Sequence, residues 1–276
     1  MELAESLMLA QGALAVTLSE GSDVPMWEPD QGSPPSWEEV RLAGLFAAET
    51  DAGALCSALS LLPLAAPPES RELADQAWER AWMERFQPMR FGRQLWIIPS
   101  GYAPPDPGAQ LIHLDPGLAF GTGSHPTTRL CLEWLDGLPL EGLNVVDLGC
   151  GSGVLGIAAA IKGARHVLCI DNDPQAVEAT LENARRNSVG DRITATTAPH
   201  MPAGQADVLV ANILAGTLLE LREPISLALR PGGLLALSGV LEEQREQVAE
   251  AYADDFGTLA HRQLDEWVLL HGALRT

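Results

Sequence analysis

The chain has 276 residues, 46% of them hydrophobic, which is enough to bury a sizeable core. Its 37 acidic residues outnumber 17 basic ones, and the net charge of −20 argues against a nucleic-acid partner, because phosphates are bound by Lys and Arg. No apolar run reaches the roughly 18 residues of a membrane span, and two glutamates near Met1 are unlike a basic signal sequence. We therefore expect a globular cytoplasmic protein.

The cysteines show neither CxxC spacing nor histidine partners at metal-ligand spacing. They are Cys56, Cys131, Cys150 and Cys169. This pattern predicts reduced, mostly buried thiols, with no disulfide framework and no metal site.

Residues 1–72 are expected to form a small α+β recognition domain. The pattern predicts a helix at the start, strands over 13–18 and 40–46, and a helix over 54–62. Residues 1–70 contain eleven acidic residues against one arginine, which is −10 of the total charge of −20. This part of the chain is either an acidic solvated surface or a surface that attracts a basic partner.

Residues 73–108 are expected to connect this domain to a larger one. Trp78, Trp82 and Phe86 recur every four positions and predict one packed face of a helix over 74–86. A strand is expected over 94–99, followed by a proline-rich segment.

From residue 109 to 276 strands and helices alternate, which predicts a parallel sheet covered on both faces. Strands are expected over 143–148, 166–170, 192–196, 207–211 and 234–238. Two final apolar runs, over 256–261 and 267–271, are joined too closely for a helix between them. They should form a hairpin with one antiparallel strand. The helix that follows Asp171 should be capped by Asp173, with Pro174 in its first turn.

The segment VVDLGCGSG, residues 145–153, indicates a strand that enters a glycine turn and then a helix. Glycines let the backbone approach a ligand closely, and Asp171, about 20 residues later, is placed to accept both hydroxyls of a ribose. As GxGxxG the loop would indicate a nicotinamide-dependent oxidoreductase. As DxGxGxG, starting at Asp147, it resembles the first motif of Rossmann-like S-adenosyl-L-methionine-dependent methyltransferases. The aspartate and the terminal hairpin favour the methyltransferase.

The segment DVLVANIL delivers Asn212 to the same edge of the sheet, where such enzymes meet the methyl acceptor. As an alternative, Asn212 could tie down a loop. A nucleic-acid base methyltransferase usually has prolines and an aromatic residue after its asparagine. Here Ile213 and Leu214 follow, so that class is disfavoured.

Longer strings resemble one family, the ribosomal protein L11 methyltransferases, called PrmA. They are AGLFAAETD, WERAWMERFQPMRFG, LWIIPS, LDPGLAFGTGSHPTTRLCLEWL, IDNDP, DVLVANIL and GLLALSG. The resemblance implies a seven-stranded methyltransferase sheet with a terminal antiparallel hairpin, a ferredoxin-like N-terminal domain, and S-adenosyl-L-methionine as cofactor. It also implies transfer of methyl groups to the N-terminal α-amine and lysine ε-amines of ribosomal protein L11 by a monomeric enzyme. The alternatives are a small-molecule amine methyltransferase and a non-catalytic ribosome-associated binding protein.

By motif match, the resemblance assigns cofactor contacts to Thr128, Gly149, Asp171 and Asn212. Gly151 and Gly153 belong to the same loop, and Asn212 is also the expected catalytic residue. Asp147 is expected to orient the loop or to approach the amine of the cofactor. The alternative is a structural role, in which Asp147 accepts hydrogen bonds from backbone amides. The chain departs from the family at its start, where a helix replaces the expected first strand. Either a strand is missing from the small sheet or the true start lies upstream of Met1.

The stretch GTGSHPTT, residues 121–128, has no P-loop lysine, and no third group orients its Ser-His pair as a hydrolase requires. We expect Ser124 to cap a helix that has Pro126 in its first turn, and His125 to be structural, with a contact to cofactor or substrate as the alternative for His125. The stretch should bring Thr128 onto a cofactor held by the loop at residues 149–153.

Overall fold

The computed structural model describes residues 2–20, 40–72, 87–104, 106, 108–115, 123–198 and 201–276. Two compact units are present, Met1–Ala77 and Trp78–Thr276. The predicted linker helix over 74–86 and the first two residues of GTGSHPTT lie outside the described residues. The domain limits at residues 72 and 108 stay predictions. No helix within these described ranges is long and apolar enough to cross a membrane.

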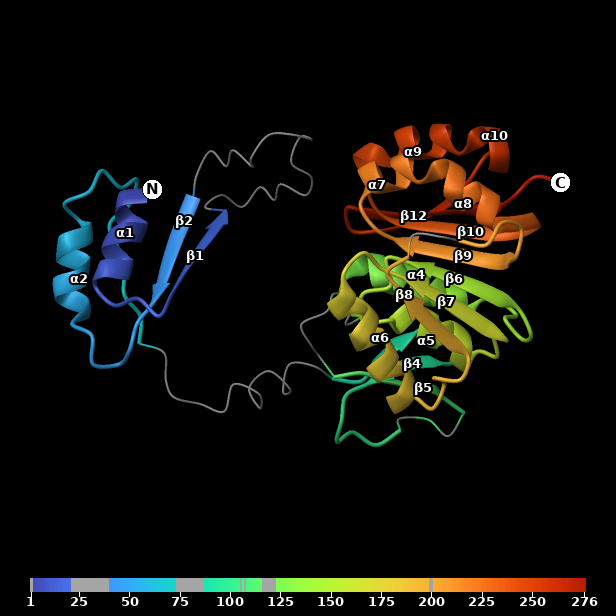
Figure 1. Cartoon of the computed structure of the whole chain (residues 1–276), viewed down its shortest axis with the longest axis horizontal. Coiled ribbons are helices and arrows are strands. Elements are labelled where there is room, and N and C mark those ends of the chain that lie inside the picture. The colour runs from blue at the N-terminus through green and yellow to red at the C-terminus, as the bar shows by residue number, and fades with distance from the viewer. Residues whose placement is uncertain are drawn as a thin grey trace. The chain divides into compact units, whose positions relative to one another are not determined.

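The first unit pairs two helices with a two-stranded antiparallel sheet (Figure 1). Its elements are α1 (Glu2–Ala10), β1 (Ala15–Glu20), β2 (Val40–Leu45) and α2 (Ala52–Leu59). Ala4, Met8 and Leu59 form its small buried core. The second helix starts two residues earlier than predicted because the Asp51 carboxylate accepts a hydrogen bond from Ala54 N at 3.0 Å. The ferredoxin-like arrangement stays a prediction, since the described residues of this unit provide two strands.

The second unit is built on a seven-stranded sheet with the order β11-β12-β10-β9-β6-β7-β8. These strands are β6 (Asn144–Leu148), β7 (His166–Ile170), β8 (Ile193–Thr196), β9 (Ala206–Asn212), β10 (Leu229–Leu241), β11 (Ala260–Leu264) and β12 (Trp267–Ala273). Strands β6 to β10 pair in parallel, whereas β12 is antiparallel to both β10 and β11. The predicted methyltransferase-type sheet with a terminal antiparallel hairpin is confirmed.

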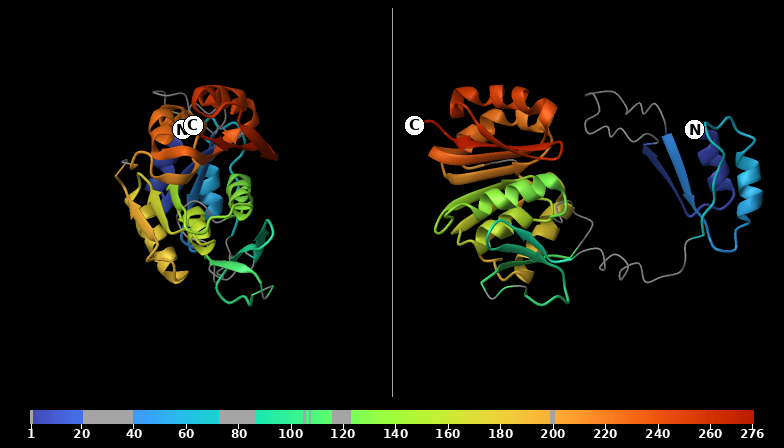
Figure 2. Two further views of the ribbon diagram at one scale, coloured as in Figure 1. Left: turned by 90° about the vertical axis from the view of Figure 1, so that its right-hand side faces the viewer. Right: turned by 180° about the vertical axis from the view of Figure 1, so that it is seen from behind.

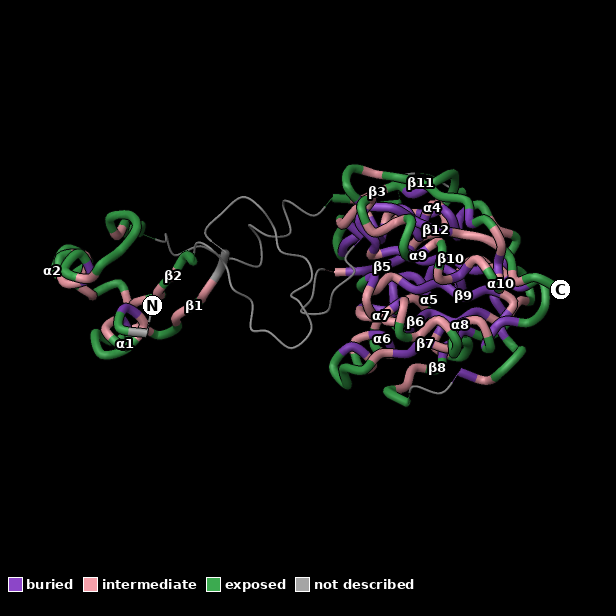
Figure 3. The backbone as a smooth tube through the Cα atoms, turned by 90° about the horizontal axis from the view of Figure 1, so that it is seen from above, coloured by how far each residue is buried: buried purple, intermediate pink, exposed green. Residues whose placement is uncertain are grey.

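Helices cover both faces of this sheet, as Figure 2 shows. One buried cluster holds Cys131, Ile157 and Ala184, and a second holds Leu218, Ile225 and Val248. The first cluster involves α4 (Pro126–Asp136), α5 (Val154–Ile161) and α6 (Pro174–Arg186). The second involves α7 (Ala215–Glu220), α8 (Arg222–Ala228), α9 (Arg245–Ala251) and α10 (Ala253–Phe256), with the short 3-10 turn η1 (Glu242–Gln244) before α9. Buried residues run along the strands between these layers (Figure 3).

A three-stranded sheet joins the first of these clusters. It consists of β3 (Met89–Phe91), β4 (Leu95–Ile98) and β5 (Gln110–His113). Its side chains Phe91, Leu95 and Ile112 are buried together with those of α4 and α5. The Asn187 amide at the end of α6 exchanges two hydrogen bonds with the backbone of His113, at 2.7 and 2.9 Å. The small sheet is therefore anchored to the large domain.

The predicted hairpin is present, but its first strand is shifted along the chain. That strand was expected over 256–261, whereas β11 spans Ala260–Leu264 and Phe256 is the last residue of α10. The Phe256 ring packs 6.0 Å from the Tyr252 ring inside the core, and Gly257, with a φ of 71°, ends the helix. A short apolar run does not separate strand from helix by itself. The prediction that most of the cysteines are buried is confirmed, because Cys131, Cys150 and Cys169 are buried.

Candidate functional site

The glycine loop follows β6 at the edge of the sheet where the parallel strands end. Gly149, Gly151 and Gly153 have φ values of 75°, 53° and 79°, a region that favours glycine. The amides of Gly149 and Cys150 both donate to the carbonyl of Ile170, at 2.7 and 3.1 Å. A Cβ on Gly149 would lie 2.1 Å from Ile213 Cγ2. The loop is thus held close to the ends of β7 and β9, and its three glycines present backbone without a side chain.

Asp171 stands at the end of β7 and holds this loop. Its Oδ2 accepts a hydrogen bond from Gly151 N at 2.8 Å, and its Oδ1 accepts one from Asp173 N at 3.0 Å. The side chain is half-buried, and each carboxylate oxygen has a further lone pair. Asp173 caps α6 as predicted, accepting from Gln175 N at 2.8 Å. The predicted ribose contact of Asp171 is therefore compatible with its role in the loop.

Thr128 and Asn212 are 84 positions apart, and the fold brings their side chains into contact. The Asn212 Nδ2 donates to Thr128 Oγ1 at 3.3 Å. Thr128 is fully buried on α4, whereas Asn212 is half-buried at the end of β9. Since Nδ2 carries the donors, the Asn212 carbonyl oxygen is left as an acceptor at the sheet edge.

The start of α4 corrects one prediction. His125, rather than Ser124, is the N-cap, and its Nδ1 accepts a hydrogen bond from Thr127 N at 3.3 Å. Pro126 occupies the first turn as expected. The imidazole also packs edge-on against the Trp267 ring, with centroids 5.0 Å apart. The structural role predicted for His125 is therefore confirmed, and it orients the helix that carries Thr128.

Asp147 lies beneath the glycine loop and is fully buried. Its Oδ2 accepts a hydrogen bond from Gly156 N at 2.8 Å, and its Oδ1 has no hydrogen-bond partner. Burial raises the pKa of this carboxyl to about 7, although the Gly156 amide opposes the shift. Of the roles considered for Asp147, the bond to a backbone amide is the one observed.

The raised pKa of Asp147 predicts a pH dependence of stability. Between its unfolded value of 3.8 and about 7, the folded chain holds a proton that the unfolded chain releases. The contribution of this carboxyl therefore declines as pH rises through that window. Asp147→Asn keeps an acceptor for Gly156 N and cannot ionise. The melting temperature of the variant minus that of the parent should increase as pH rises from about 5 to about 8. A difference that does not change with pH would contradict the raised pKa of Asp147.

Two residues of the site were not predicted. Thr180 on α6 is buried, and its Oγ1 donates to Gly151 O at 3.1 Å. Gly239 in β10 has a φ of 82°, and a Cβ there would lie 2.3 Å from Ile213 O. Nothing in a helix sequence marks Thr180 as a loop contact. Gly239 is part of the string GLLALSG, but its importance depends on a neighbouring strand.

The whole chain matches a known family. The sequence profile described as "Ribosomal protein L11 methyltransferase (PrmA)" covers residues 1–275. The chain belongs to this family. Family membership confirms the methyltransferase interpretation of the DxGxGxG motif over the nicotinamide-dependent one.

Similar proteins and one similar structure agree with the family. The ribosomal protein L11 methyltransferase of Pseudomonas putida (strain W619) is 52% identical over 277 residues, covering 99% of this chain and 95% of that protein. The protein of the same name from Pseudomonas aeruginosa (strain LESB58) is 50% identical, covering 99% and 94%. The crystal structure of a ribosomal protein L11 methylase from Lactobacillus delbrueckii subsp. bulgaricus has a TM-score of 0.64 and 31% identity, covering 69% of this chain and 100% of that one.

Proposed function

We propose that this PrmA-family chain transfers methyl groups from S-adenosyl-L-methionine to ribosomal protein L11, at its N-terminal α-amine and at lysine ε-amines. The observation that carries the proposal is the contact between Thr128 and Asn212 at the sheet edge that also holds the glycine loop and Asp171. The four cofactor contacts assigned by motif match come from four separate segments. Their convergence at one edge is what a single methyl-transfer site requires.

The residues present fit the cofactor. Three glycines at positive φ leave a cradle without side chains, and Thr180 and Asn183 of α6 hold it from behind through the carbonyls of Gly151 and Ser152. The backbone of this loop would lie along the methionine part, and Asp171 would accept from the ribose hydroxyls. When bound, the cofactor supplies an electrophilic methyl group on a sulfonium sulfur.

The acceptor amine must present a free lone pair. A protein α-amine has a pKa near 8, so it is often neutral at physiological pH, whereas a lysine, near 10.4, has to lose a proton to water. The Asn212 carbonyl oxygen accepts an N–H of the amine and aims its lone pair at the methyl group. Thr128 holds the Asn212 amide in that orientation. Catalysis is then mainly positioning in a reactive geometry.

Thr128→Ala should lower kcat about tenfold, because the loss of one hydrogen bond frees the Asn212 amide to rotate. Thr128→Ser keeps the hydroxyl and should retain most of the activity. Calorimetric titration with the cofactor separates the two roles of Thr128. Weaker binding by Thr128→Ala supports the predicted cofactor contact, and unchanged binding leaves only the positioning of Asn212. Unchanged kcat in both variants would contradict the positioning role.

The acidic N-terminal segment supports recognition of a basic protein. Residues 1–70 carry −10 of the total charge of −20, and a protein that binds ribosomal RNA is expected to be cationic. Opposite charges accelerate association in a salt-dependent way. The association rate with purified ribosomal protein L11 should fall severalfold between low and physiological ionic strength. A rate insensitive to salt would contradict this steering.

Mass spectrometry of ribosomal protein L11 after incubation with enzyme and cofactor tests the proposal directly. Methylation of the enzyme's own lysines should add almost nothing to the signal, because Lys162 is the only lysine in the sequence. Its side chain is 9% exposed, and its Nζ donates a hydrogen bond to Asp136 O at 2.9 Å. Mass increases of one or more methyl groups, mapped to the N-terminus and to lysines, are expected. If ribosomal protein L11 remains unmethylated although the enzyme binds the cofactor, the proposal is overturned.

A further inference from the structure

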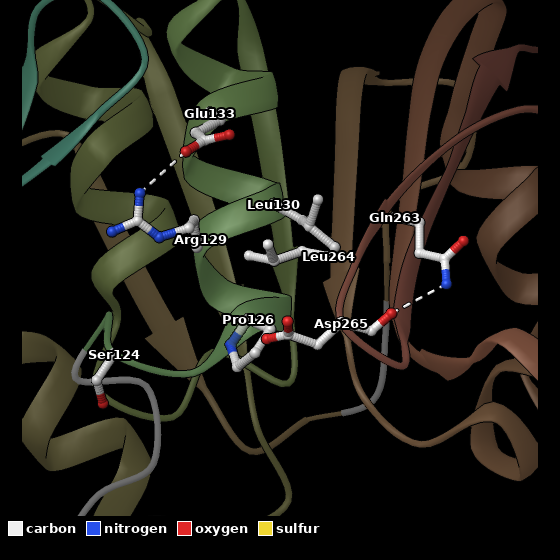
Figure 4. Close-up of a pocket in the computed structure, with 8 residues that line it drawn as sticks. All are labelled: Ser124, Pro126, Arg129, Leu130, Glu133, Gln263, Leu264 and Asp265. Atoms are coloured by element: carbon white, nitrogen blue, oxygen red, sulfur yellow. Dashed lines mark hydrogen bonds and ion pairs between the residues drawn. The ribbon is translucent and has the colours of Figure 1, made fainter.

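A cleft of about 520 Å³ lies between α4 and the β11–β12 hairpin (Figure 4). Pro126, Leu130 and Glu133 line it from the helix, and Gln263, Leu264 and Asp265 from the hairpin. The site assigned to cofactor and amine uses none of these residues. The cleft is therefore available to another part of a ligand.

The cleft combines an apolar floor with acidic ends. Leu130 from the helix and Leu264 from the hairpin both line it (Figure 4), and Leu130 is 4% exposed. Glu133 lies at one end and Asp265, on the exposed hairpin turn, lies beside Pro126 at the other. A long cationic side chain has matching chemistry, because its aliphatic stem covers apolar surface while its charged end stays near carboxylates.

Among the described residues that line the cleft, Arg129 is the one cation, and it is already engaged. Arg129 Nη1 pairs with Glu133 at 3.1 Å, and its guanidinium lies 5.0 Å from the centre of the Phe91 ring on β3. This places the Arg129 charge on the β3 side of the helix. Because Arg129 neutralises Glu133, the net negative charge of the described lining comes from Asp265, and Glu266 follows it in the sequence.

The cleft and the proposed amine site share one helix. Pro126, Leu130 and Glu133 follow a spacing that places them on one face of α4, whereas Thr128 points to the sheet and Asn212. Strand pairing puts the hairpin at the same edge, since Asn212 pairs with Ser238 and Trp267 with Leu241 on β10. The width of a helix, about 10 Å, separates the two faces. About three to four extended residues span that distance.

We infer that this cleft binds a cationic segment of the protein substrate, with a Lys or Arg about three to four residues from the amine that receives the methyl group. The inference rests on the proposed function. The cleft would make a second contact with the substrate, in addition to the contact at the amine. Through this contact the catalytic unit itself would select amines that have a Lys or Arg nearby in the sequence.

The test uses the full-length enzyme and purified ribosomal protein L11. The variant Glu133→Gln/Asp265→Asn removes both carboxylates, and Asn tolerates the positive φ of 53° at position 265. The control Glu178→Gln/Glu250→Gln removes two charges from exposed positions on α6 and α9. The cleft variant should raise KM for ribosomal protein L11 by about fivefold to thirtyfold, with kcat and cofactor affinity unchanged. The control should stay within about twofold of the parent.

Binding of labelled ribosomal protein L11 to enzyme loaded with S-adenosyl-L-homocysteine separates the two proposals. If the parent enzyme transfers no methyl group but the cleft variant binds ribosomal protein L11 more weakly than the parent, the result would support binding at the cleft and overturn the proposed activity. Methyl transfer with equal KM in the cleft variant and the control would overturn the cleft and leave the activity standing. Absence of binding by the parent enzyme would overturn the cleft as well. Equal melting temperatures of the two variants show that α4 is intact.

Discussion

Asn212→Ala should reduce kcat at least about 100-fold while S-adenosyl-L-methionine affinity stays within about threefold. The size of the effect follows from removing one group that acts on the reacting centre, which commonly costs two to three orders of magnitude. The cofactor affinity is preserved because the glycine loop and Asp171 are held by their own hydrogen bonds, to Ile170 O and Gly151 N among others. Single-turnover methyl transfer and calorimetric titration measure the two quantities.

Asn144→Ala is the matched control. Asn144 is also a half-buried strand asparagine, but it lies at the start of β6, and its Nδ2 donates to Gln205 O at 3.3 Å. It is therefore at the opposite edge of the sheet from Asn212, and kcat should be retained. Unchanged turnover in Asn212→Ala, or a parallel loss in both variants, would show that Asn212 does not position the amine.

Gly239→Ala should lower the free energy of unfolding by about 2–4 kcal/mol and methyl transfer by more than tenfold. The positive φ costs an alanine about 1 kcal/mol, and the added Cβ would lie 2.3 Å from Ile213 O and 2.7 Å from Ile213 C. Because these are backbone atoms, the end of β9 has to move, and Asn212 moves with it. Urea unfolding and kcat measure the two effects.

Gly142→Ala isolates the contribution of the close approach. Gly142 has a φ of 75°, and a Cβ there would meet nothing within 4 Å. The free energy of unfolding of this variant should fall only by the cost of the left-handed conformation, and its methyl transfer should be unchanged. Equal losses of stability in the two variants would mean that the approach of β10 to Ile213 has no importance for the site.

Elements with strong local signals were predicted well. The glycine loop, the Asp173 cap and the hydrophobic strands β6, β7 and β9 depend on backbone conformation and local pattern, which neighbouring residues dictate. Two errors came from weak local signals. Ser is a stronger N-cap signal than His, yet His125 caps α4, and the strand expected from Phe256 begins only at Ala260 because Phe256 ends a helix. In both places packing, against Trp267 and Tyr252, outweighed local preference.

The residues alone were sufficient for the fold class, the family resemblance and the segments of the site, because each depends on a pattern within a short stretch. Folding decided how those segments meet. The hydrogen bond from Asn212 to Thr128, the approach of Gly239 to Ile213 and the cleft between α4 and the hairpin all join residues that are distant in sequence. Strand register and helix packing set such contacts, and these depend on the whole core rather than on any one stretch of the chain.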